Sequence, residues 1–334
     1  MYIGVKRRLT VITLSTSIII PCFNEEEVIE ETYARIKAVM KEFKTYELIF
    51  INDGSRDRTL PILTNLAKSD KTVRVLSFSR NFGHQPAATA GIHHATGDVA
   101  IIIDADLQDP PELFPEMIRL HLEEKANVVY GQRTKRKGES IFKKATAKLY
   151  YRLLNRLSEV PMHTDTGDFR LIDRKVMDAF CQFPEKNKYI RGIINWVGFK
   201  QVPIHYVREP RFAGETKYPL RKMLNFALTG LLYFTKKPLK LAMNLGIICI
   251  LVGLGLAAWT LIRYFVGEGI VPGWSSQLIT IIFFGGVQLF TIGVLGGYIG
   301  SIFDEVKNRP EYVIGEKLNF PESNPVKKSS QVRR

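Results

Sequence analysis

Short apolar segments alternate with amphipathic helical patterns between Thr16 and Tyr130. The apolar segments are rich in Ile and Val, which is typical of strands buried on both faces of a sheet. These segments lie at Thr16–Pro21, Glu47–Asn52, Val73–Phe78, Val99–Asp104 and Asn127–Tyr130. The helical patterns between them lie at about Glu25–Phe43, Asp57–Ser69, His84–Thr96 and Pro111–Glu124. The alternation predicts an α/β domain with a mostly parallel sheet and helices on both of its faces.

Two long segments without charged residues follow, at Leu241–Ile262 and Ile270–Phe303. Each is longer than the roughly 20 residues that cross a bilayer as a helix. They predict a hairpin of two transmembrane helices over residues 239–303, preceded by an amphipathic juxtamembrane helix over residues 219–238. Lys and Arg flank the hairpin on both sides but are scarce in its loop, so we expect the first domain and both termini in the cytoplasm. Two overlapping GxxxG spacings favour close helix packing, within the hairpin or between subunits of a homo-oligomer, and they involve Gly293, Gly296, Gly297 and Gly300.

Charge is unevenly distributed along the chain. The formal net charge is +14, from 47 Lys and Arg against 33 Asp and Glu, and nine basic residues against one acid lie between Arg133 and Arg156. A helix expected from about Ser140 to Leu157 carries a basic stripe in this stretch. Beside membrane spans, the stripe favours contact with anionic lipid or lipid phosphate, with an ordinary solvated helix face as the alternative. Nucleic-acid binding is a further alternative, but no nucleic-acid motif supports it.

Several common chemistries find no support in the sequence. The α/β pattern contains no G-x-G-x-x-G and no Walker A motif, so neither dinucleotide nor P-loop chemistry is indicated. The cysteines are scattered, which predicts neither a disulfide framework nor a zinc site and fits a reducing cytoplasmic compartment. They are Cys22, Cys181 and Cys249.

The clearest candidate site follows the fourth apolar segment, where Asp104 and Asp106 are separated by one residue. Asp109-Pro110-Pro111 then stops the strand. Open α/β sheets bind ligands at the carboxyl ends of their parallel strands, and paired carboxylates suit Mg²⁺ or Mn²⁺ on a phosphorylated substrate. The alternative is a solvated strand end, with Asp109 capping the next helix.

Two earlier strand ends carry polar residues that we expect at the same edge of the sheet. They are Pro21–Glu26 and Asn52–Ser55. Each has a local alternative, because acids complement a helix N-terminus and an Asn-Asp-Gly-Ser sequence forms turns and helix caps. With Asp104 and Asp106, however, three neighbouring strands direct polar groups toward one cleft.

Three motifs carry a resemblance to a known family: IIIPCFNEEE, NDGS and DADLQDPPE. They resemble inverting family-2 glycosyltransferases of GT-A fold, and most closely the polyprenyl-phosphate sugar transferases, which include dolichyl-phosphate mannose synthases and bactoprenol glucosyltransferases. The resemblance covers about residues 16–235 and implies a Rossmann-like GT-A catalytic domain. Where many relatives have Tyr, this chain has Phe23, which preserves a stacking role but not a hydroxyl hydrogen bond. The resemblance implies a nucleotide-sugar site at Pro21, Phe23, Glu25, Asp53, Asp104 and Asp106, and a metal site at Asp104, Asp106 and Gln108.

Two later segments resemble the acceptor side of the same family. Thr164–Leu171 is similar to its D-x-G or TGxFR segment, with Asp165 as the best match and Asp168 as the alternative. The resemblance implies that Asp106 is catalytic, and that Asp165 or Asp168 is catalytic too, either as a base or by orienting the acceptor. The alternative for this segment is a plain glycine-containing turn without a catalytic role. Glu209–Tyr218 is similar to an R-x-x-G-x-S-K-Y segment, with Thr in place of Ser. The implied phosphate-binding cations are Arg133, Arg136, Arg211 and Lys217.

The resemblance implies metal-dependent, inverting transfer of a hexose from a nucleotide sugar to a polyprenyl phosphate. The two-span hairpin is more similar to bactoprenol glucosyltransferases than to the shorter mannose synthases, which favours UDP-glucose, undecaprenyl phosphate and a bacterial plasma membrane. A GDP-mannose-dependent mannosyltransferase is the alternative enzyme, and a lipid-phosphate-binding scaffold is the alternative without catalysis. The expected organisation is an N-terminal tail (1–15), a GT-A domain (16–218), a juxtamembrane helix (219–238), two transmembrane helices (239–303) and a cytoplasmic tail (304–334).

Overall fold

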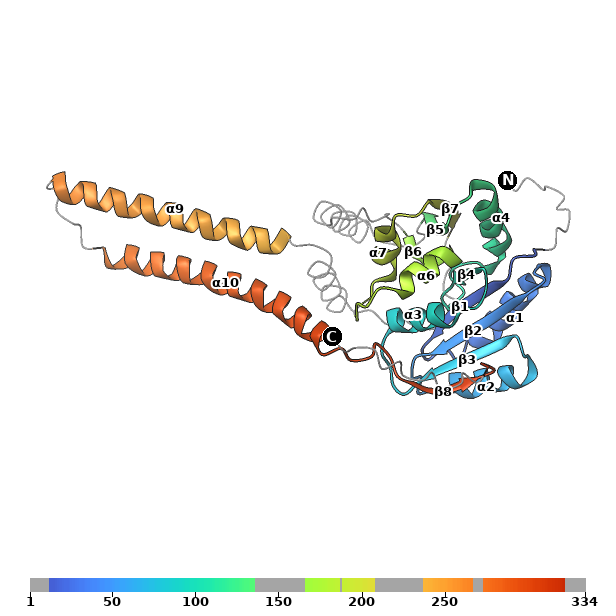
Figure 1. Ribbon diagram of the computed structural model, residues 1–334. Coiled ribbons are helices and arrows are strands. Elements are labelled where there is room, and N and C mark those ends of the chain that lie inside the picture. The colour runs from blue at the N-terminus through green and yellow to red at the C-terminus, as the bar shows by residue number, and fades with distance from the viewer. Residues whose placement is uncertain (1–11, 136–165, 187, 208–236, 267–272, 322–334) are drawn as a thin grey trace, which may run out of the picture. The chain divides into compact units, whose positions relative to one another are not determined.

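The computed structural model describes residues 12–135, 166–186, 188–207, 237–266 and 273–321 (Figure 1). The chain divides into two compact units. The sheet unit comprises residues 1–144, 163–215 and 310–334, and the hairpin unit comprises residues 145–162 and 216–309. The hairpin unit is therefore formed by two insertions in the chain of the sheet unit, which resumes after each of them.

Eight strands of the described residues form one sheet, in the order β7-β5-β6-β4-β1-β2-β3-β8 (Figure 1). Strands β4, β1, β2 and β3 are parallel neighbours, and β5 is parallel to β7. Strand β6 runs antiparallel between β4 and β5, and β8 runs antiparallel beside β3. The strands are β1 (Thr16–Cys22), β2 (Tyr46–Asn52), β3 (Val73–Phe78), β4 (Val99–Ile102), β5 (Val128–Lys135), β6 (Thr166–Asp173), β7 (Gln201–Val207) and β8 (Ile314–Leu318).

Helices pack on both faces of this sheet, as the sequence predicts. Successive side chains of a strand point to opposite faces, so Ile18 and Ile19 of β1 belong to different cores. The core around Ile18 includes side chains of α1, α2 and α4, and the core around Ile19 includes side chains of α3, α6 and α7. The helices are α1 (Ile29–Val39), α2 (Thr59–Ser69), α3 (His84–His94), α4 (Phe114–Glu124), α6 (Arg174–Cys181) and α7 (Ile190–Val197), with short 3-10 turns η1 (Met40–Glu42) and η2 (Pro111–Leu113).

The expected α/β elements are confirmed up to β5, with changes at their ends. Helix α1 begins at Ile29 rather than near Glu25, because turns occupy the residues after β1. The largest difference is β8, which lies in the segment that the sequence assigned to a cytoplasmic tail. Its register on β3 pairs Leu318 with Val75, a contact between distant parts of the chain that no local pattern encodes.

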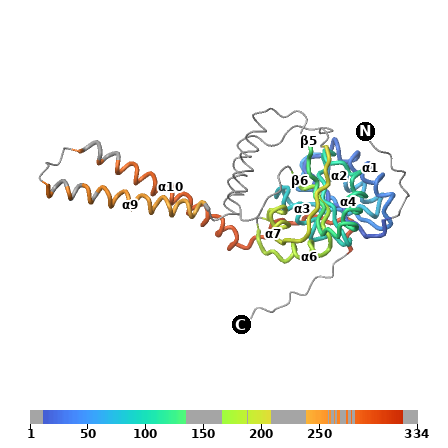
Figure 2. Tube along the Cα trace, turned by 90° about the horizontal axis from the view of Figure 1, so that it is seen from above, coloured from blue at the N-terminus to red at the C-terminus, as the bar shows by residue number. Residues whose placement is uncertain are grey.

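The hairpin unit contains two long apolar helices, α9 (Lys237–Val266) and α10 (Trp274–Val306). They lie side by side in both views (Figure 2). Pro238–Leu256 has a mean hydropathy of 2.1 and Thr280–Val306 one of 1.7, and each segment is long enough to cross a membrane. Their apolar side chains are exposed, as Leu254 (63%) and Leu289 (72%) illustrate. The predicted two-helix hairpin is thus confirmed, and its exposed apolar surface indicates a membrane-associated protein.

Candidate active site

The carboxyl ends of β1, β2 and β4 meet at one edge of the sheet because these strands are parallel neighbours. Side chains join the loops that follow β1 and β2. The Asn24 N–H donates to Ser55 Oγ at 3.0 Å, and the Glu25 N–H donates to Thr59 Oγ1 at 2.9 Å. The structure therefore brings together the two polar segments that the sequence placed at this edge.

The residues predicted to line a nucleoside pocket differ in exposure. Pro21 is a buried residue of β1 and pairs with Ile51 of β2. Phe23 and Glu25, after the strand, are partly exposed at the edge. A ligand at this edge could therefore reach Phe23 and Glu25, whereas Pro21 shapes the loop from within the sheet.

The segment after β4 turns earlier than expected. The strand ends at Ile102 rather than at Asp104, and the chain does not stay extended. Leu107 has a left-handed φ of 57°, and the Gln108 N–H donates to Asp106 Oδ1 at 3.2 Å, which closes a local turn. Burial still alternates, because Asp104, Asp106 and Gln108 are partly exposed while the residues between them are buried. The three predicted metal ligands thus share the open side of this segment.

Crowded carboxylates make this segment a suitable place for a cation. Partial burial, together with the Asp106, Asp109 and Asp168 carboxylates, raises the pKa of Asp104 to about 6, although His84 opposes the shift. A cation would relieve this repulsion, and carboxylate and amide oxygens are the ligands that Mg²⁺ and Mn²⁺ prefer. No group of three His, Cys, Asp or Glu side chains within the described ranges could hold a metal alone. The residues present fit a cation that takes its remaining ligands from phosphate and water.

Asp168, at the start of β6, lies among donors from two helices. His84 Nε2 and Gln85 Nε2, in the first turn of α3, are 3.0 and 3.1 Å from Asp168 Oδ2. Arg191 Nε, from α7, is 3.0 Å from Asp168 Oδ1. Burial alone would raise the pKa of Asp168, but Arg191 and His84 hold it well below its usual range. His84 Nε2 also lies 3.6 Å from Asp104 Oδ1, so this ring connects the β6 carboxylate with the β4 segment.

Sequence reasoning missed His84, Gln85 and Arg191. Burial lowers the pKa of His84, but the Asp104 and Asp168 carboxylates outweigh it and raise the pKa to about 9. The ring therefore carries a positive charge at neutral pH. No local motif marks His84, because its partner Asp168 is 84 positions away in the chain.

Asp53 binds the loop that leads into α3. Its Oδ1 accepts from the Phe82 N–H at 2.7 Å, and its Oδ2 accepts from the Gly83 N–H at 2.9 Å and from Asn81 Nδ2 at 2.8 Å. Gly54, next to it, has a φ of 63°, and an added Cβ would approach the Arg80 backbone to 2.3 Å. Asp53 thus has a visible role in loop geometry, and its predicted contact with a nucleotide base stays a prediction.

Arg133 is paired inside the protein rather than exposed at the edge. Its Nε donates to the Tyr206 hydroxyl at 3.2 Å, and its Nη2 lies 3.6 Å from Asp109 Oδ1. Tyr206 also donates a short hydrogen bond to the fully buried Asp109. The alternative of Asp109 as a helix cap is therefore wrong, because neither η2 nor α4 has a side-chain cap. The predicted phosphate contact of Arg133 stays a prediction.

Four predicted site residues lie outside the described residues. They are Asp165, Arg136, Arg211 and Lys217. The predicted basic helix at residues 140–157 and most of the juxtamembrane helix at residues 219–238 also lie outside.

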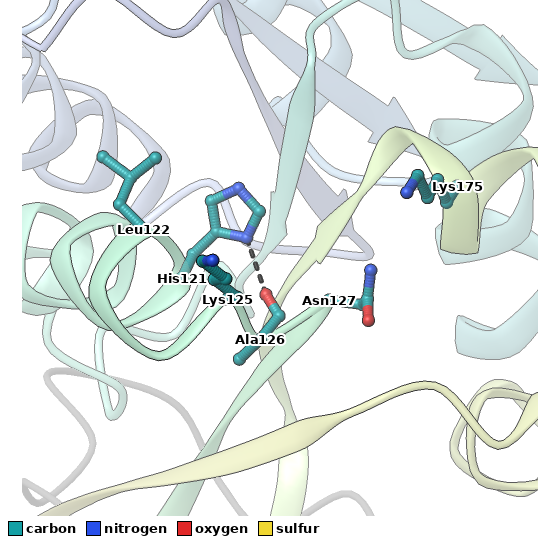
Figure 3. Close-up of a pocket in the computed structure, with 6 residues that line it drawn as sticks. All are labelled: His121, Leu122, Lys125, Ala126, Asn127 and Lys175. Carbon is teal, nitrogen blue, oxygen red and sulfur yellow. Dashed lines mark hydrogen bonds between the residues drawn. The ribbon is translucent and has the colours of Figure 1, made fainter.

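A surface pocket lies at the opposite edge of the sheet, where β5 begins and β6 ends (Figure 3). His121, Lys125 and Asn127 line it, together with Lys175 of α6, and His121 Nδ1 is 2.7 Å from the Ala126 carbonyl oxygen. This pocket is separate from the carboxylate edge, because β4 and β5 both run toward that edge and away from the pocket.

Family profiles match both parts of the chain. The profile of glycosyl transferase family 2 matches residues 17–181, and the profile of the GtrB C-terminal hairpin matches residues 237–302. The known structure of glucosyl-3-phosphoglycerate synthase from Mycobacterium tuberculosis is 19% identical and covers 66% of this chain and 79% of its own, with a TM-score of 0.46. This structural likeness is weak.

Relatives match nearly the full length of the chain. The uncharacterized glycosyltransferase YkcC of Bacillus subtilis is 50% identical over 89% of this chain and 92% of its own length. The prophage bactoprenol glucosyl transferase homolog of Escherichia coli is 41% identical over 90% and 98%. The bactoprenol glucosyl transferase of Shigella phage SfII is 42% identical over 90% and 97%. The chain therefore belongs to glycosyl transferase family 2, and it is a glycosyltransferase of the group that carries a GtrB-type C-terminal hairpin.

Proposed function

We propose that this glycosyltransferase transfers glucose from UDP-glucose to a polyprenyl phosphate, with a divalent cation and with inversion at the anomeric carbon. The observation that carries the proposal is the crowded carboxylate segment after β4, on the open edge of the sheet. Relatives named as bactoprenol glucosyl transferases, or as a homolog of them, at 41% and 42% identity support the sugar and the lipid acceptor.

The donor half of the site would be the edge formed by β1, β2 and β4. Asp104, Asp106 and Gln108 would hold the cation. A bound divalent cation supplies electrostatic stabilisation where negative charge develops on the departing diphosphate. Phe23 and Glu25, which are partly exposed beside this segment, would contact the nucleoside.

The acceptor needs little activation by a base. A phosphate monoester has a second pKa of about 6, so its oxygens are already largely anionic at neutral pH. One such oxygen can attack the anomeric carbon directly, and a single displacement inverts the configuration there. Cationic side chains would orient the phosphate, because guanidinium groups bind its oxygens in pairs. The proposed set is Arg133, Arg136, Arg211 and Lys217, with Asp165 as the candidate for orienting the acceptor.

A polyprenyl phosphate presents its phosphate at the membrane surface and its tail in the bilayer. The apolar helices α9 and α10 support a site that works at this surface. Basic residues flank the hairpin, with Lys236, Lys237 and Lys240 before it and Lys307 and Arg309 after it. By the positive-inside rule, these charges favour a sheet unit on the cytoplasmic side, where nucleotide sugars are available.

A donor panel tests this proposal. Membranes that contain the full chain are incubated with radiolabelled UDP-glucose, UDP-galactose or GDP-mannose, and the label in the organic extract is counted. We expect label in lipid from UDP-glucose only, and none when undecaprenyl phosphate is depleted. Label from GDP-mannose alone would replace the proposal with a mannosyltransferase. No lipid-soluble label from any donor would favour the non-catalytic scaffold.

A further inference from the structure

The first turn of α3 links two carboxylates on different strands. Asp168 belongs to β6, and Asp104 follows β4, which is the antiparallel neighbour of β6. His84 Nε2 lies 3.0 Å from Asp168 Oδ2 and 3.6 Å from Asp104 Oδ1. The same ring nitrogen therefore lies within hydrogen-bond distance of the β6 carboxylate and within ion-pair distance of the proposed cation segment.

Protein side chains surround both oxygens of Asp168. Oδ2 faces His84 and Gln85, Oδ1 faces Arg191, and the residue is only 9% exposed. A base must reach the proton that it removes within hydrogen-bond distance. Here Oδ2 is used by the side chains of α3, while Oδ1 is buried and ion-paired with Arg191 of α7, so neither oxygen is open to a substrate.

Gln85 makes this arrangement rigid. Its Nε2 donates to Asp168 Oδ2, and its Oε1 accepts from the Ile190 N–H at 3.0 Å. Ile190 begins α7, the helix that supplies Arg191. One amide thus connects the first turn of α3, the carboxylate of β6 and the start of α7, so the position of His84 is determined by three elements.

Asp53 fixes the backbone of the loop that precedes α3. The Asp53 carboxylate accepts hydrogen bonds from the Phe82 and Gly83 N–H groups, directly before His84. His84 is therefore fixed both at its backbone and at its ring. A ring held in this way limits where the neighbouring Asp104 carboxylate can lie, as the outer partners of metal ligands do.

We propose that Asp168 is a positioning residue and not a base: through His84 it orients the Asp104 carboxylate for the cation and diphosphate of the nucleotide sugar. This inference rests on the proposed donor site at Asp104, Asp106 and Gln108. It does not depend on which sugar is transferred.

Nucleotide binding tests the inference independently of sugar transfer. The full chain, purified in detergent, is titrated with Mn²⁺ and UDP by calorimetry, and GDP serves as a second probe. We expect Asp168→Asn and His84→Ala each to weaken binding of the Mn²⁺–nucleoside diphosphate by about 10-fold to 100-fold, the usual loss when an outer partner of a metal ligand is removed. The double variant should have the same affinity as the single variant that binds less tightly, because both changes interrupt the same connection from Asp168 through His84 to Asp104.

Two controls separate positioning from general damage. His121→Ala removes a histidine at the opposite edge of the sheet and should leave binding unchanged. Gln85→Ala keeps the His84–Asp168 contact and should weaken binding less than His84→Ala. If Asp168→Asn does not fold, as judged by its thermal unfolding, the comparison of His84→Ala with these two variants decides the question.

Kinetics of the transfer reaction distinguish a positioning residue from a base. At saturating donor and Mn²⁺, positioning variants should keep kcat within about threefold of wild type while KM for the donor rises. A loss of kcat by about 10²-fold to 10⁴-fold with unchanged Mn²⁺–nucleotide affinity would identify Asp168 as a base and overturn the inference. Additive effects of the two changes, or no Mn²⁺–nucleotide binding by the wild-type chain, would overturn it too. Sugar transfer that fails while the binding differences appear would instead contradict only the proposed function.

Discussion

At the scale of single residues, the carboxylates near this edge differ in their surroundings and so in their chemistry. Partial burial and the neighbouring acids raise the pKa of Asp104 to about 6, although His84 lies close to it. Asp168 lies among cations, and its pKa is held low. Asp109 is fully buried against Tyr206 and Arg133. The same side chain therefore serves as a candidate cation ligand in one place and as a structural ion-pair partner in another.

Replacing Asp106 tests the cation segment. We expect Asp106→Ala to lower sugar transfer by about 10³-fold or more, because the charge stabilisation that a cation supplies is worth several kcal/mol. The chain should still insert into the membrane, since Asp106 is not part of the hairpin. The measurement is incorporation of label into lipid by membranes with equal amounts of each chain. Asp178→Ala, which changes an exposed acid of α6, is the matched control. Transfer that persists in the Asp106 variant with added Mg²⁺ or Mn²⁺ would refute the metal assignment.

Asp53 should contribute to stability through the loop before α3. Asp53→Ala leaves the Phe82 and Gly83 N–H groups without their acceptor, which should lower the free energy of unfolding by about 1–3 kcal/mol. Asp53→Asn retains one carbonyl oxygen and should lose less. Chemical denaturation of the purified chain measures both changes. Equal stability of all three chains would show that water replaces these bonds without cost.

At the scale of secondary structure, the strand after the hairpin completes the sheet unit. β8 pairs with β3 and covers an edge that would otherwise be open to unwanted strand pairing. Tyr312, just before it, stacks on Phe78 with 5.0 Å between ring centroids and an interplanar angle of 9°. The buried pair Lys188–Glu311 (3.1 Å) ties the same segment to the region before α7.

Truncating Tyr312 should loosen this strand. Tyr312→Ala removes the ring stack and the contact with His93 Nδ1 at 3.0 Å, and we expect it to destabilise the strand by about 2 kcal/mol. Tyr312→Phe keeps the stack and should cost about 1 kcal/mol or less. Hydrogen exchange of the amides in residues 314–318, followed by mass spectrometry, measures the loss of protection. Unchanged exchange in Tyr312→Ala would show that strand pairing alone holds β8.

At the scale of the whole molecule, the hairpin is inserted in the chain of the sheet unit. The sheet unit includes residues 163–215 and resumes at residue 310, so the chain connects it to the hairpin at both ends. A Cβ added at Gly293, Gly296 or Gly300 would meet nothing within 4 Å, so α10 has room there for a packing partner. Association of subunits through these glycines stays a prediction.

Topology can be tested with single cysteines. In a chain whose Cys22, Cys181 and Cys249 are replaced by serine, Glu268→Cys lies in the hairpin loop and Lys327→Cys in the tail. We expect a membrane-impermeant maleimide to label position 268 but not position 327 in intact cells, because the flanking positive charges keep both termini inside. Cells opened by detergent provide the control, in which both positions react. The reverse pattern in intact cells would contradict a cytoplasmic sheet unit.

Much of the fold follows from the sequence alone. The spacing of apolar and polar residues is a local property of the sequence. The order of strands and helices up to β5, and the two apolar spans, can therefore be predicted from short stretches of sequence. The shared edge of β1, β2 and β4 also follows, because parallel strands joined by helices end on one side. The carboxylates after β4 and the family could therefore be identified before any contact was known.

Only the tertiary structure decided which groups meet at that edge. Asp168 is surrounded by His84, Gln85 and Arg191, which come from distant parts of the chain. Strand β8 pairs with β3 although the hairpin lies between them in the sequence. Hydrogen bonds and ion pairs of this kind form between residues that are close in space but distant in the sequence, so no local sequence pattern predicts them. For the same reason the roles of the acids remained open in the sequence. Burial and neighbouring acids shift the pKa of Asp104 upward, whereas neighbouring cations hold the pKa of Asp168 low despite its burial.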